Sequence, residues 1–74
     1  MVKIKITNID NGVEYETQTN NLKQYFKENH RLIGIKSSAE IDFIVNKFDR
    51  TGYVQIPYTL LGFDMVISCM QIKN

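Results

Sequence analysis

The chain has few of the residues that disulfide-bonded and metal-binding proteins require. Its 74 residues include one Cys, one His, one Pro and no Trp. A single cysteine, Cys69, excludes an internal disulfide framework and a cysteine-rich zinc site, and it fits a reducing compartment. The four glycines are isolated, which excludes a glycine-rich phosphate loop. We therefore expect neither a metal nor another cofactor.

Long apolar runs and an excess of one charge are also lacking. No run approaches the roughly 20 apolar residues that span a bilayer, and the alternating start differs from a signal peptide. The net charge is +1, whereas a nucleic-acid-binding domain usually has a basic excess. We expect a cytoplasmic protein without membrane contact (in the host-cell cytoplasm if a phage encodes it), with protein favoured over nucleic acid as its partner.

What the chain does have is enough apolar side chain for one small core. Hydrophobic residues make up 43% of the sequence, with four Tyr and four Phe, which argues against disorder. A chain of this length forms a single domain, residues 1–74. It can bury only about 60% of the surface that its unfolded form exposes, so we expect marginal stability.

The N-terminal third predicts a β-hairpin around Asn11-Gly12, a dipeptide that favours tight turns. An even-length loop keeps the apolar sets of both strands on one face. A two-residue loop pairs Ile6 with Thr17, and a four-residue loop pairs Ile6 with Tyr15. The residues that alternate with polar neighbours are Val2, Ile4 and Ile6, then Val13, Tyr15 and Thr17.

Two helices are predicted in the middle of the chain. Asn20 or Asn21 can cap the first, which should end before Gly34. Its expected buried side is Leu22, Tyr25, Phe26 and Leu32.

The second helix is predicted from about Ser38 to Arg50. Ser37 and Glu40 form a capping box, and Gly52 supplies a left-handed end. Phe43 either widens the buried stripe or lies exposed. The stripe itself is Ile41, Ile44, Val45 and Phe48.

The C-terminal third predicts a strand over residues 53–56 that Pro57 stops, an apolar connection over 58–64, and a last strand over 65–72. A helix through Leu61, Met65, Cys69 and Ile72 is the alternative for the last segment. The order β-β-α-α-β-β indicates an α+β domain. We expect a small, mostly antiparallel sheet, made by the N-terminal hairpin and the C-terminal strands, with two helices on one face.

The last predicted strand is apolar on both faces, with Val66 and Met70 on one and Met65, Ile67 and Cys69 on the other. Such a strand is either central and covered on both sides or part of a contact. Two helices can hardly cover both faces, so we expect a bound partner protein or a homodimer.

The residue types that carry catalysis lack the companions they need. His30 has no second imidazole or suitably placed carboxylate. Cys69 lies in an apolar run, where a thiol behaves as a small hydrophobe with a raised pKa. Asp10 lies in a turn without the repeated carboxylates of a calcium loop. We expect no enzymatic activity.

Two groups of residues are candidates for partner binding. Tyr58, Leu60, Leu61 and Phe63 crowd one connection, as anchors of protein contacts do, although the connection could instead fold back as a lid over the core. Lys23, Lys27 and Arg31 repeat at i, i+4 and i+8 on the first helix, where their repulsion costs a few tenths of a kcal/mol per pair. This stripe is either an anion or acidic-partner site or an ordinary solvated face.

Residues 41–54 resemble the recognition helix and first wing strand of winged helix-turn-helix proteins. The apolar spacing of the helix leads into Gly52-Tyr53-Val54, and Gly34-Ile35 resembles the preceding turn. The resemblance covers under a third of the chain and implies a DNA-binding transcriptional regulator. Glu40, Asp42 and Asn46 stand where arginines would reach base edges, so the resemblance also allows a surface turned to protein contact.

The sequence therefore predicts a small, non-catalytic protein-interaction module. Its predicted contact surface is Tyr58, Leu60, Leu61 and Phe63, with Lys23, Lys27 and Arg31 as an electrostatic complement. Ile, Lys and Asn are abundant (10, 7 and 7 residues), as AT-rich coding produces. We expect a phage or mobile-element protein that inhibits a host defence complex, for example a CRISPR effector. The alternatives are a DNA-binding regulator and a structural homodimer.

Overall fold

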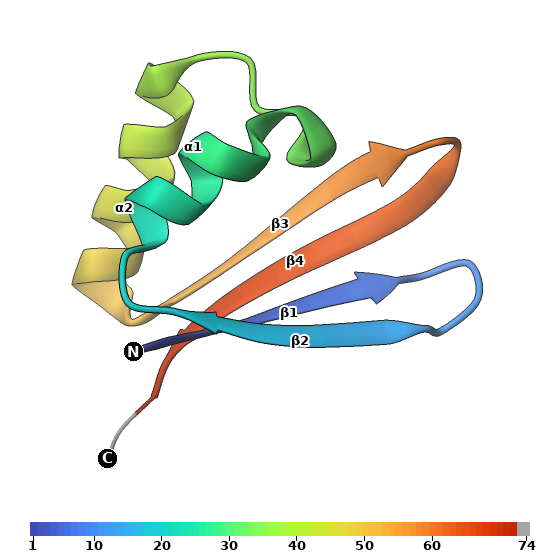
Figure 1. The fold of residues 1–74 in the computed structure, drawn as a ribbon, viewed down its shortest axis with the longest axis horizontal. Coiled ribbons are helices and arrows are strands. Elements are labelled where there is room, and N and C mark those ends of the chain that lie inside the picture. Colours follow the sequence, from blue (N-terminus) through green and yellow to red (C-terminus); the bar gives the residue numbers. More distant parts are fainter. Residues whose placement is uncertain (73–74) are drawn as a thin grey trace.

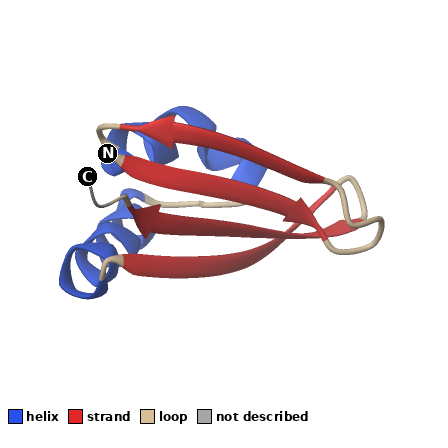
Figure 2. Cartoon of the chain, turned by 90° about the horizontal axis from the view of Figure 1, so that it is seen from below, coloured by secondary structure: helices blue, strands red, loops and turns tan. Residues whose placement is uncertain are grey.

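A computed structural model describes residues 1–72 as two β-hairpins that flank a pair of helices. The four strands form one antiparallel sheet in the order β2-β1-β4-β3. Both helices lie on the same face of this sheet, and both hairpins extend beyond them (Figures 1 and 2). This is the predicted α+β fold. The elements are β1 (Val2–Asn8), β2 (Glu14–Thr19), α1 (Leu22–Ile33), α2 (Ser38–Thr51), β3 (Tyr53–Leu60) and β4 (Phe63–Gln71).

The first hairpin has an even-length loop, as the alternation requires. Ile6 pairs with Tyr15, and the Asn8 N–H donates to the Val13 carbonyl at 2.9 Å, so residues 9–12 form a four-residue loop. The Asn8 side-chain oxygen accepts the N–H groups of Asp10 and Asn11, at 3.0 and 3.3 Å. Gly12, at φ 75°, ends the loop in the left-handed region. The four-residue register is confirmed.

Helix α1 begins and ends where its caps were predicted. Of the two candidate caps, Asn21 accepts the Gln24 N–H at 3.1 Å, and Gly34 ends the helix at φ 78°. The prediction that Leu32 is buried is wrong, because its side chain is 56% exposed. Three turns of helix bring Ile33 into line with Leu22 and Phe26, which turns Leu32 away from the core.

Helix α2 also follows its predicted signals. The Ser37 hydroxyl accepts the Glu40 N–H at 3.3 Å, and Gly52 ends the helix at φ 75°. The Glu40 carboxylate reaches back to the Lys36 N–H at 3.3 Å, one residue before the cap. Phe43 does not widen the buried stripe, since it is 69% exposed. Ile41 and Phe48 are buried, and Ile44 and Val45 pack against the core.

The second hairpin corrects two predictions. Strand β3 continues through Pro57 to Leu60, so the predicted stop at Pro57 is wrong. The Gly52 carbonyl accepts the Gln71 N–H at 3.0 Å, and alternation then turns the backbone groups of odd-numbered β3 residues away from β4. Because β3 is the edge of the sheet, Pro57 removes no hydrogen bond.

The predicted connection over residues 58–64 is also wrong, because residues 58–60 belong to β3 and residues 63–64 to β4. Leu60 pairs with Phe63, so the turn consists of Leu61 and Gly62 alone. The predicted last strand is confirmed as β4, and the helix alternative is wrong.

The core lies between the sheet and the helices. Its fully buried side chains are Phe26 from α1, Ile4 from β1, and Ile67 and Cys69 from β4. Strand β4 is central in the sheet. A central position was part of one of the two alternatives for a strand that is apolar on both faces. The second face of β4 is not covered: Val66 is half-buried and Met70 exposed, and the described helices lie on the other side of the sheet (Figure 2). At the end of the pair, the Ile72 N–H donates to the Met1 carbonyl at 3.1 Å.

Burial of Cys69 makes the folded protein less stable at alkaline pH. Burial raises the pKa of the Cys69 thiol from 9.0 to about 12, so the thiolate forms more readily in the unfolded chain than in the folded one. The free energy of unfolding should therefore fall as the pH rises from about 9 towards 12. We expect Cys69→Ala to show a shallower fall than wild type, measured by urea denaturation at about pH 8 and about pH 10.5. Burial also raises the pKa of Tyr25 and Tyr58, and this effect of burial persists in the variant. The smaller part of the Tyr25 shift that Cys69 causes is lost with the thiol, which makes the fall shallower still. Equal falls would contradict the prediction.

Candidate protein-contact site

The two hairpins carry apolar side chains past the helices on the helix side of the sheet. Ile6 pairs with both Tyr15 and Ile67, Tyr58 pairs with Met65, and Leu60 pairs with Phe63. Because alternate residues of a strand share a face, these side chains continue the rows that are buried under the helices. We call this set the distal apolar face: Ile6, Tyr15, Tyr58, Leu60, Phe63 and Met65.

The distal apolar face runs from the core outward to the hairpin ends. Ile6 and Tyr58 are half-buried and pack against the core, whereas Tyr15 is 61% and Phe63 46% exposed. Burial raises the pKa of Tyr25 on α1, and the neighbouring Cys69, Tyr58 and Tyr15 add to the effect. Tyr25 therefore borders the distal apolar face on its helix side.

The turn at the end of the face contains a strained leucine. Leu61 and Gly62 have φ values of 51° and 83°, the positive pair of a type I′ turn, for which Asn-Gly is the preferred sequence. A left-handed conformation costs a residue such as leucine about 1–2 kcal/mol. Leu61 is 90% exposed, so burial within the chain does not offset this cost. Strain of this kind is concentrated at functional sites.

The two hairpin ends are tied together. The Asp64 N–H donates to the Asp10 carboxylate at 2.9 Å, and the Asp64 carbonyl accepts the Ile9 N–H at 2.8 Å. The first loop is thereby fixed against the beginning of β4, and exposed Ile9 and Val13 lie at this end of the molecule. A surface that is already ordered loses less entropy when a partner binds.

The structure brings one predicted group together. Tyr58, Leu60 and Phe63 lie on the distal apolar face, and Leu61 lies at its end. Tyr58 and Leu60 are half-buried, and the hairpin projects beyond both helices (Figure 1). These residues therefore form a projecting edge of the sheet and do not fold back as a lid.

The predicted cationic group lies elsewhere. The Lys23 ammonium is 3.1 Å from the Asp42 carboxylate on α2, and Lys27 and Arg31 line shallow depressions beside the α1–α2 connection. At 100° per residue, the cations and Tyr25 lie on opposite sides of the buried stripe of α1. The structure therefore places the cations apart from the distal apolar face.

Sequence reasoning missed two large contributors to the site, Tyr15 and Met65. Tyr15 belongs to the first hairpin and joins residues of the second through the pairing of β1 with β4. The four-residue register, which pairs Ile6 with Tyr15, was the available signal for its position on the helix side.

The distal apolar face offers contact area made of apolar and aromatic side chains. Within residues 1–72, no three His, Cys, Asp or Glu side chains gather to hold a metal ion, and Cys69 is fully buried as a protonated thiol. No helix in this part of the chain has the length and apolar character needed to cross a membrane. Comparisons with protein-family models, curated proteins and solved structures find no match.

Replacing the strained leucine should stabilise the fold. Asn is tolerated in the left-handed region and favours this turn, so Leu61→Asn should raise the free energy of unfolding by about 0.5–1 kcal/mol. Leu61→Ala is the matched control, because it removes the side chain and retains the unfavourable conformation. Urea denaturation measures both. A loss of stability in Leu61→Asn would show that the leucine side chain serves folding.

Proposed function

We propose that this protein is a small, non-catalytic protein-interaction module that contacts its partner through the distal apolar face and Leu61. Leu61 carries the proposal: it is 90% exposed and left-handed, and neither core packing nor turn preference accounts for a leucine there. Burial against a partner would account for it.

The energetics of such a contact are favourable. Burying an exposed leucine completely contributes about 1.5–3 kcal/mol, and aromatic neighbours such as Phe63 and Tyr15 are frequent anchors of interfaces. The tie between Asp10 and Asp64 orders the hairpin ends before binding, which limits the entropic cost.

The proposed setting is a phage or other mobile element, and the proposed action is inhibition of a host defence complex in the host cytoplasm, for example a CRISPR effector. The small size and the abundance of Ile, Lys and Asn support this setting. In this proposal the protein acts by occupying a surface that the complex needs.

Partner recovery tests the proposal. Tagged wild-type protein and variants are used to capture partners from the native host, and the captured partner is then titrated against each variant. Leu61→Asn and Phe63→Ser should each weaken binding about tenfold or more, as loss of an interface anchor does. Phe43→Ser is the matched control, since Phe43 is an exposed aromatic residue on α2, away from the distal apolar face.

The outcomes separate the proposal from its alternatives. Unchanged binding by folded Leu61→Asn and Phe63→Ser would contradict it. A mass that doubles with concentration for wild type but not for Leu61→Asn would identify a homodimer through this face.

DNA binding is the second candidate, supported by a gathering of cations. These cations are Lys27, Arg31 and Lys36, which lie at the α1–α2 connection. Binding through phosphates weakens steeply with salt because counterions are released. If this candidate holds, duplex affinity should fall at least tenfold between about 50 and 200 mM salt, and Lys27→Ala with Arg31→Ala should reduce the salt slope by about two. Fluorescence anisotropy measures both, and absence of duplex binding at low salt would exclude it.

A further inference from the structure

The two edges of the sheet differ in how their backbone groups are occupied. On β3, the Thr51 hydroxyl lies 2.7 Å from the Tyr53 carbonyl oxygen and accepts the Tyr53 N–H at 3.4 Å. Farther along the same edge, Pro57 has no N–H to offer. Two of the outward-facing positions of β3 are therefore blocked, as edge strands commonly are.

The β2 edge has no such protection. Alternation from the bond between Asn8 and Val13 directs the backbone groups of Tyr15 and Thr17 to β1 and those of Glu14, Glu16 and Gln18 outward. Within residues 1–72, no hydrogen bond reaches these three outward N–H and C=O pairs. The strand contains no proline. Three consecutive donor–acceptor pairs form a template for an added strand.

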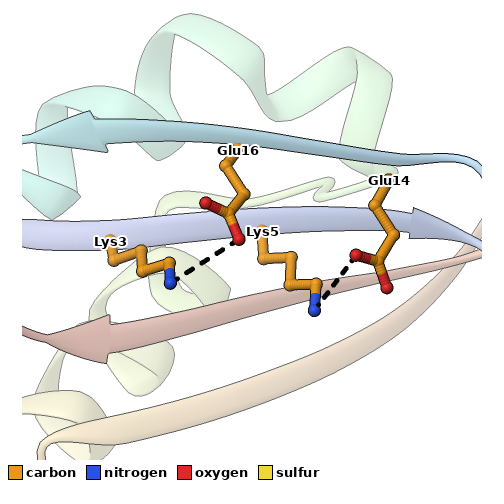
Figure 3. A network of polar contacts seen from close by, with 4 residues as sticks. All are labelled: Lys3, Lys5, Glu14 and Glu16. Carbon is orange, nitrogen blue, oxygen red and sulfur yellow. Dashed lines mark ion pairs between the residues drawn. The ribbon is translucent and has the colours of Figure 1, made fainter.

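The side chains of β2 indicate which residue types an added strand would carry. Glu14 and Glu16 lie on the open face, where Lys5 and Lys3 approach them at 3.2 and 3.5 Å (Figure 3). About half of each glutamate side chain remains exposed, and a carboxylate can accept a second cationic partner. On the helix side, exposed Tyr15 offers an apolar cross-strand contact.

A second copy of this chain is a poor occupant. Antiparallel pairing of β2 with itself sets Glu16 against Glu14 when it is centred on Tyr15, and against Glu16 when it is centred on Glu16. A register centred on Thr17 sets Glu16 against Gln18. Like charges directly opposite each other destabilise a strand pair. None of these registers places a cation opposite Glu14 or Glu16, so a basic segment fits this edge better than a second copy does.

We infer that an extended segment of the partner protein adds to β2 as a fifth strand. Its basic side chains lie on the open face opposite Glu14 and Glu16, and its apolar side chains lie beside Tyr15. The inference rests on the proposed function, because it names the kind of segment that the partner supplies.

A designed peptide tests this inference without the natural partner. The probe is a capped peptide of four Lys-Val repeats, added to isotope-labelled protein at about 1 mM, a concentration that detects weak complexes. NMR should show shifted and exchange-protected amides at Glu14, Glu16 and Gln18. A Glu-Val repeat of equal length is the control and should leave them unchanged.

Two variants separate the backbone from the charge. Glu16→Pro removes the central outward donor and no bond to β1, so affinity for the Lys-Val peptide should fall at least tenfold. Glu16→Gln keeps the backbone, so the pattern of protection should persist while the preference over the Glu-Val peptide decreases. Amide spectra of the variants without peptide establish that both fold.

Equal binding by folded Glu16→Pro, or protection on β3 in place of β2, would overturn the inference. Leu61→Asn should bind the peptide as wild type does. Failure of strand addition is thus distinguishable from failure of the proposed function, which Leu61→Asn and Phe63→Ser test against the captured partner.

Discussion

The pairing of β1 with β4 holds the domain together, and the rest of the structure depends on it. Each hairpin and each helix forms from neighbouring residues, whereas this pairing joins residues about sixty positions apart, from Val2 with Gln71 to Asn8 with Met65. It places Ile4 beside Cys69 and Ile6 beside Ile67, and it brings Ile4, Ile67 and Cys69 into the one core that also contains Phe26. Contacts this distant in sequence close a long loop and are entropically costly, so the apolar character of both central strands is what stabilises the closure.

The same pairing creates more sheet than two helices can cover. Strands β3 and β4 contain 8 and 9 residues, which corresponds to about 26–30 Å, and the longest extent of the molecule is 31 Å. The helices lie over one end of that length, and the distal apolar face is the part left over. An uncovered extension of a core is more apolar than an ordinary surface, and its inner residues Ile6 and Tyr58 pack against the core.

Local chemistry made much of this fold predictable. Side-chain caps at Asn21 and Ser37, left-handed ends at Gly34 and Gly52, and alternation in the first hairpin each depend on a few neighbouring residues. Pro57 misled because its tolerance depends on the place of β3 in the sheet, a tertiary property. The two-residue turn was missed because Leu61 contradicts the preference of that turn. Tyr58, Leu60, Leu61 and Phe63 of the second hairpin were predicted as a contact surface. Tyr15 joins them only through the central pairing, and helix rotation places the cations elsewhere.

The hydrogen bond from Ile72 to Met1 has a mechanical consequence. This bond sets the outer ends of β1 and β4 side by side. Tension applied through these two residues therefore pulls the two strands apart and breaks their hydrogen bonds one pair at a time. The hydrogen bonds between antiparallel strands lie perpendicular to the strands. A force along that direction acts on the outermost bonds first, and not on all of them together. Separating β1 from β4 through these two residues would therefore need less force than sliding the two strands past each other.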